Sequence, residues 1–182
     1  MNGDNSSASA TKSGGADPMN DLRLGAARKR LAESRGQEDA IEGLREIVAN
    51  FLGSEEIGLF KVDRRNATFE VYWSFGIDAE NYDLPRALGE VGLRRVMGGE
   101  CHVERPSHGH AGAITKVQAF VPICFANQTI AILAILRLLP QKQSFDRSDM
   151  ELFKLLSDEA AKPLFGASVN SKVVTEGPGI RA

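Results

Sequence analysis

The stretch VQAFVPICFANQTIAILAILRLL, residues 117–139, decides the fold that the sequence predicts. It contains two apolar runs, 117–125 and 129–138, separated by the short break Ala126-Asn127-Gln128. A break that contains Asn between two runs of this length is typical of a β-hairpin. Both runs are apolar on both faces, so we expect two strands in the middle of a sheet that other layers cover on each side.

The segments around this hairpin supply the rest of the sheet and its cover. Helical spacing predicts helices at 38–52, 86–97 and 147–165, and further strands are expected at 57–62, 68–75 and 100–104. Strands that hairpins connect run antiparallel. The sequence therefore predicts a three-layer α/β/α domain with a central antiparallel sheet. The first and last helices would cover one face, and the middle helix with its loops would cover the other, where a pocket can form.

Composition sets the domain boundaries. Small and polar residues dominate 1–19 and 166–182, and such segments bury too little apolar surface to fold, so we predict two disordered tails. Residues 20–36 are expected to form a lead-in helix, and 37–165 the folded domain. Hydrophobic residues make up 42% of the 182-residue chain, which is enough for one core.

Charge and cysteine content narrow the possible partners and compartments. The formal net charge of −2 gives no overall attraction to nucleic acid or to a membrane surface, so neither is an expected partner. No apolar run reaches the roughly 18–20 residues of a membrane span. The two cysteines are too few for a disulfide framework, and the N-terminus lacks a signal-peptide pattern. Cytoplasm is therefore the expected location.

The lead-in helix has a local excess of positive charge, which comes from Arg23, Arg28, Lys29 and Arg30. Its apolar residues Leu24, Ala27 and Leu31 share one face. Two interpretations stay open. The helix either extends a dimer layer, or its four basic residues contact an acidic face of a partner protein, to which they would be drawn electrostatically.

Three motifs resemble those of the GAF domain family, and the resemblance covers about 37–165. Val121-Pro122-Ile123 followed by 127–133 is similar to the family's "VPL…g…iGvL" hairpin, with Ala131 in place of the usual Gly. Residues 145–156 resemble the "F…D..lL" entry to its closing helix, and 92–100 resemble its middle helix and strand. The family is a sensory and regulatory scaffold whose members bind small molecules or cofactors, or dimerise.

The resemblance implies a non-enzymatic regulatory or sensory module that acts through homodimerisation and contact with a signalling protein. We expect no catalytic residues, because no nucleophile–base set or phosphate-binding loop occurs. The alternative is a small-molecule or cofactor sensor with a pocket between the sheet and 77–114. Seven residues are candidates for its lining: Phe60, Tyr72, Trp73, Phe120, Cys124, Cys101 and His102. Strict strand alternation puts Tyr72 and Trp73 on opposite faces, so only one of them could point there.

Cys101-His102 raises two cofactor alternatives. In bilin-binding relatives a Cys followed by His attaches the chromophore upstream of the "VPI" strand, but Cys101 falls in an expected strand and not in a helix. With His108 and His110 the dipeptide offers sulfur and imidazole groups that suit zinc or copper. The spacing matches no standard metal site, so we expect none and leave the cofactor unknown. The simplest interpretation is that Cys101 packs as a small apolar residue.

The sequence matches the motifs of two further functional classes of the family only in part. Free methionine sulfoxide reductases need a nucleophilic and a resolving cysteine, and 104–120 contains no cysteine where the family has one, so a redox enzyme is the least favoured alternative. Nucleotide-binding relatives have an "NK…F…DE" motif. This chain has Lys142, Phe145 and Asp149, but Gln and Met replace the Asn and the Glu. We expect Lys142 and Asp149 to form an ion pair that holds the loop.

Overall fold

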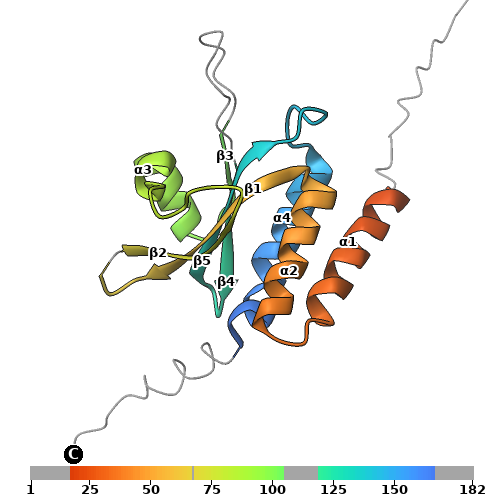
Figure 1. Cartoon of the computed structure of the whole chain (residues 1–182), viewed down its shortest axis with the longest axis horizontal. Helices are drawn as coiled ribbons and strands as arrows, with labels where there is room; N and C mark the ends of the chain where they lie inside the picture. The colour runs from red at the N-terminus through yellow and green to blue at the C-terminus, as the bar shows by residue number, and fades with distance from the viewer. Residues whose placement is uncertain (1–16, 67, 105–118, 167–182) are drawn as a thin grey trace, which may run out of the picture.

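A five-stranded antiparallel sheet forms the centre of the computed structural model, which describes residues 17–66, 68–104 and 119–166 (Figure 1). The strands are β1 (Ser54–Asp63), β2 (Thr68–Phe75), β3 (His102–Val103), β4 (Ala119–Phe125) and β5 (Gln128–Leu138). Their order across the sheet is β2-β1-β5-β4-β3, and every neighbouring pair is antiparallel. The predicted fold class is confirmed.

The β4–β5 hairpin forms where the opening stretch predicts it. Ala126 and Asn127 make the turn with φ of 48° and 60°, the positive values that a two-residue hairpin turn requires. The middle of both strands is buried, because β5 lies at the centre of the sheet between β1 and β4. The apolar character of both faces thus reflects cover on both sides.

Helices cover the two faces unequally (Figure 1). On one face lie α1 (Pro18–Ala32), α2 (Gln37–Ile47) with the wider π-helical turn Val48–Leu52, and α4 (Arg147–Glu159). The kinked helix α3 (Leu84–Met97) covers the other face. We call these the three-helix face and the α3 face. This is the predicted three-layer arrangement, with α1 packed against α2 and α4 on the side away from the sheet (Figure 1).

Several element ends differ from the prediction. Helix α1 begins at Pro18, so Pro18 and Met19 are helical although the sequence assigned them to the tail; Asp17 caps the helix by accepting a hydrogen bond from the Met19 amide. The closing helix, predicted as continuous to 165, breaks at Ala160 and resumes over 161–166. Its start agrees with the prediction, because Asp146 caps it and forms a reciprocal capping box with Asp149.

A β-bulge in β2 overturns the predicted strand alternation. Leu59 pairs with Trp73 and Phe60 pairs with Val71, which leaves Tyr72 without a partner opposite it. As a result both Tyr72 and Trp73 pack against the core of the three-helix face. The Tyr72 hydroxyl donates a hydrogen bond of 3.3 Å to the Leu164 carbonyl on that side.

Candidate functional site

The seven residues predicted to line one pocket lie on two faces of the sheet. Phe60 and Phe120 belong to the core under α3, and His102 stacks on Phe120 with 6.3 Å between the ring centroids. Tyr72, Trp73 and Cys101 pack against the core of the three-helix face, which the sheet separates from α3. Cys124 contacts Ser157 of α4 and lies near Thr129, whose hydroxyl binds the Val96 carbonyl of α3. The structure therefore does not bring the seven side chains to one cavity.

Side chains fill the space beneath the middle of α3. Phe60 and Phe120 are only 2% and 1% exposed and pack with Leu84, Leu88 and Val96 of the helix. His102 lies so close to Gly92 that a Cβ on the glycine would be 3.0 Å from the imidazole ring. This tight approach leaves no room for a large planar cofactor at this point.

A pocket of about 340 Å³ does occur on the α3 face, nearer the end of the β1–β2 hairpin. It is lined by Val62, Asp63, Arg64, Phe69, Leu93 and Met97. We call it the hairpin pocket. None of these residues was among the predicted lining, so this is a different site from the one that the sequence suggested. Two features of the sequence could have indicated this pocket. Val62 and Phe69 flank the turn between two expected strands and pair across it, and Leu93 and Met97 are spaced one helical turn apart.

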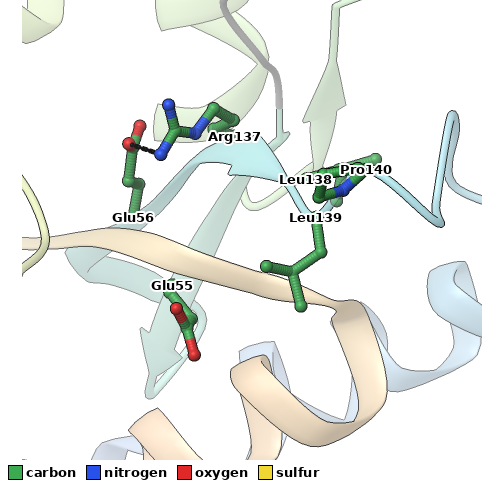
Figure 2. A pocket seen from close by; sticks show the side chains of 6 residues that line it. All are labelled: Glu55, Glu56, Arg137, Leu138, Leu139 and Pro140. Atoms are coloured by element: carbon green, nitrogen blue, oxygen red, sulfur yellow. Dashed lines mark ion pairs between the residues drawn. The ribbon is translucent and has the colours of Figure 1, made fainter.

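A second pocket, of about 310 Å³, lies where β1 begins and β5 ends. Figure 2 shows that its acidic residues Glu55 and Glu56 point to opposite sides of β1. Glu56 is paired with Arg137 at 2.6 Å, while Leu138, Leu139 and Pro140 complete the wall. Its charged groups are therefore paired or turned apart, and they do not converge on a ligand.

The Cys101 thiol occupies an environment that suppresses its chemistry. Burial, with smaller contributions from Cys124 and Asp158, raises the pKa of the Cys101 thiol to about 11, so at neutral pH it stays protonated and a poor nucleophile. Cys124 accepts a weak hydrogen bond from the Ser157 hydroxyl at 3.6 Å, and its sulfur lies 3.9 Å from the Thr129 hydroxyl. Both cysteines are free thiols.

The buried carboxylate of Asp149 organises the junction between α1 and the domain. The expected Lys142–Asp149 ion pair is present at 2.7 Å. Arg23 of α1 also binds Asp149, at 2.6 Å, and donates to the Phe51 carbonyl and the Ser148 hydroxyl. We call Arg23, Lys142 and Asp149 the charge cluster. The part played by Arg23 was missed because it lies 126 residues from Asp149 in the sequence.

The other basic residues proposed for partner binding also form intramolecular ion pairs. Arg28 donates to both carboxylate oxygens of Glu159 on α4, at 2.9 and 3.1 Å. Arg30 binds Asp39 and Glu46 of α2, and Lys29 lies 3.9 Å from Glu33 on its own helix. The positive charge of α1 is thus largely used to attach this helix to its neighbours.

Metal binding finds no support in the part of the chain that the structure describes. No group of three or more His, Cys, Asp or Glu side chains there could hold an ion. His108 and His110, the other members of the suggested cluster, lie outside the described residues. Among the described helices none is both long and apolar enough to cross a bilayer.

Comparisons with known proteins identify the fold. No family model and no curated protein matches the sequence. Among solved structures, the GAF domain of a phosphoenolpyruvate-protein phosphotransferase from Acinetobacter is 18% identical, with a TM-score of 0.64 over 86% of this chain and 99% of that one. The GAF domain of the Escherichia coli potassium sensor histidine kinase KdpD is 12% identical, with a TM-score of 0.53 over 85% and 99%.

An enzyme with the same fold is also similar. The free methionine-R-sulfoxide reductase of Neisseria meningitidis is 20% identical, with a TM-score of 0.52 over 84% of this chain and 96% of that one. Structural similarity at identities this low shows the fold, and the function has to be argued from the residues of the site. The strand order, the two helical layers and these matches together show that this chain has the fold of a GAF domain.

Proposed function

We propose that the protein is a non-enzymatic regulatory domain of the cytoplasm that forms a homodimer through α1 and signals by contact with a partner protein. The fold supports a regulatory or sensory role, since two of the similar domains come from a sensor kinase and a phosphotransferase. The raised pKa of Cys101 argues against the reductase alternative, because that chemistry begins with a thiolate. The filled space under the middle of α3 argues against a bilin.

Exposed apolar side chains on α1 carry the proposal of a dimer. Met19 and Leu22, three residues apart on one side of the helix, are 72% and 69% exposed. Each would gain about 1.5–3 kcal/mol if fully buried against a second copy. Met150, at the start of the neighbouring helix α4, is also exposed and enlarges the apolar area of this layer.

The attachment of α1 makes this surface suitable for a dimer. The charge cluster attaches the first half of the helix, and in the second half Arg28 Nε donates to both carboxylate oxygens of Glu159 on α4. A rigid helix loses little conformational entropy when it packs against a partner. Because the basic residues are occupied within the chain, we favour the architectural role of α1 over docking through Arg23, Arg28, Lys29 and Arg30.

Light scattering on a double variant, Met19→Lys with Leu22→Lys, tests the dimer. We expect a dimer for the unmodified chain at high micromolar concentration and a monomer for the variant, because two charges would be buried at the interface. Val91→Lys is the matched control, since Val91 is 66% exposed but lies on α3, across the sheet. A strictly monomeric unmodified chain, or a double variant that stays dimeric, would refute the proposed interface.

A further inference from the structure

We propose that the hairpin pocket binds a small amphipathic anion, with an apolar or aromatic body and a single carboxylate. This proposal stands independently of the proposed dimer, because the pocket lies on the α3 face and the proposed interface lies on the opposite side of the sheet (Figure 1). Its volume of about 340 Å³ is within the range of small-molecule sites.

The walls of the pocket define the apolar body of the ligand. Val62 and Phe69 pair directly across the β1–β2 hairpin and form the wall on the sheet. Leu93 and Met97 lie one turn apart on α3 and form the opposite wall. All four side chains are half-buried, so each keeps apolar surface that a ligand could cover. Phe69 and Met97 favour an aromatic group, because aromatic rings and thioethers pack well against one.

Two charged residues, Asp63 and Arg64, line the pocket and differ in what they contact. Asp63 accepts hydrogen bonds from the Arg65 amide and the Asn66 side-chain amide, both at 2.9 Å, so the turn uses its carboxylate. Arg64 is exposed and forms no ion pair with any residue that the structure describes. A guanidinium without a partner beside an apolar wall is suited to bind a carboxylate in bidentate fashion.

Two nearby arginines on α3 show why Arg64 is distinct. Arg94 is paired with Glu90 and Arg95 with Glu100, each at 3.1 Å. Their charges are largely compensated on the helix surface, and neither residue lines the pocket. The cation available to a ligand in the pocket is therefore Arg64.

The α3 wall of the pocket follows a kink in the helix. Gly89 interrupts the helix with φ 60° and ψ 176°, a conformation that is essentially restricted to glycine. The segment after Gly89 carries Leu93 and Met97, and its far end is tied to the sheet because the Thr129 hydroxyl donates to the Val96 carbonyl at 2.9 Å. Leu93 and Met97 therefore lie on a segment that the kink separates from the start of α3 and that the Thr129 contact holds against the sheet.

A matched set of probes tests the ligand class. Titration calorimetry with 4-phenylbutyrate, 4-phenylbutanol and 4-phenylbutylamine keeps the apolar body constant and changes only the head group. We expect the carboxylate to bind most tightly and the amine most weakly. Arg64→Gln should weaken phenylbutyrate binding about five- to tenfold and leave phenylbutanol unchanged, the effect of losing one charge-assisted contact.

Two further variants test whether the probes bind in the hairpin pocket and contact Arg64. Arg65→Gln removes the same charge from the neighbouring residue, which does not line the pocket, and should leave binding of all three probes unchanged. Leu93→Asp should abolish binding of phenylbutyrate, with circular dichroism confirming that the chain stays folded. The proposal is overturned if no probe binds, if the three bind equally, or if Arg64→Gln and Arg65→Gln weaken phenylbutyrate binding alike.

Discussion

At the scale of single residues, Asp149 should contribute more to stability than any exposed acid. Its side chain is 0% exposed and is contacted by two cations. Asp149→Asn keeps the shape but leaves Arg23 and Lys142 without a counter-charge in a largely buried site. We expect a loss of about 3 kcal/mol in the free energy of unfolding, measured by urea denaturation.

The control for Asp149 is Asp158→Asn. Asp158 pairs with Lys154 at 3.1 Å, but both side chains are more than half exposed. An exposed pair of this kind contributes at most about 1 kcal/mol. Similar losses in the two variants would show that the charge cluster adds no more than a surface ion pair.

Cys101 allows a second prediction at this scale. Because burial raises its pKa to about 11, the native thiol is almost fully protonated at pH 8. In a Cys124→Ser background, iodoacetamide should alkylate native Cys101 about a hundredfold more slowly than in the urea-unfolded chain, where the pKa is about 8.5. The native rate should rise as the pH approaches 11. Fast alkylation of the native protein at pH 7 would reveal a thiolate and reopen the reductase alternative.

At the scale of elements, Gly89 should be sensitive to substitution for reasons of backbone conformation alone. A Cβ at this position would contact nothing within 4 Å, so only the unusual φ and ψ oppose a side chain. Gly89→Ala should therefore cost about 1–3 kcal/mol, or straighten α3 and alter the hairpin pocket. Thermal unfolding and titration with 4-phenylbutyrate measure these two outcomes.

Gly25 provides the matched comparison for Gly89. It also has open space around its Cβ position, but it lies within α1 with no positive φ. Gly25→Ala should raise stability by up to about 1 kcal/mol, since alanine favours the helix. If the two substitutions change stability equally, the kink in α3 does not depend on glycine.

Local patterns in the sequence predicted most elements because their causes are local. The turn at Ala126-Asn127 between two apolar runs and the Asp146 cap both act within a few residues, and both appear in the structure. The failures have non-local causes. A bulge opposite Leu59 and Phe60 turned Tyr72 and Trp73 to the same side, so neither of them faces α3.

The distinction between local and non-local causes also applies to the ion pairs of α1. The excess of arginine on α1 was visible in the sequence, but its partners were not, because Glu159 lies 131 residues from Arg28. An ion pair between distant segments depends on the packing of whole helices, which composition and periodicity do not describe. The sequence suggested an external partner or a dimer layer for this helix, and the structure adds internal ion pairs that the sequence does not reveal.

At the scale of the whole molecule, α1 should be part of the folding unit and not a removable extension. Ala27 and Leu31 are buried in the same core as α2 and α4. Arg23 is one of the two cations that pair with Asp149, and the other is Lys142. Deleting residues 1–35 would expose that core and leave Lys142 as the sole partner of Asp149 within the charge cluster. We expect a loss of at least about 3 kcal/mol in the free energy of unfolding, from the apolar burial of Leu31 and the broken ion pair together.

Deleting residues 1–16 is the control, because it keeps Asp17, the helix cap, and every α1 contact described above. This shorter truncation should unfold at the same urea concentration as the full chain and should keep the dimer seen by light scattering. The longer truncation should lose both stability and the dimer. If the 1–35 deletion unfolds like the full chain, then α1 is only loosely attached, and the basic residues regain their place as candidates for docking a partner protein.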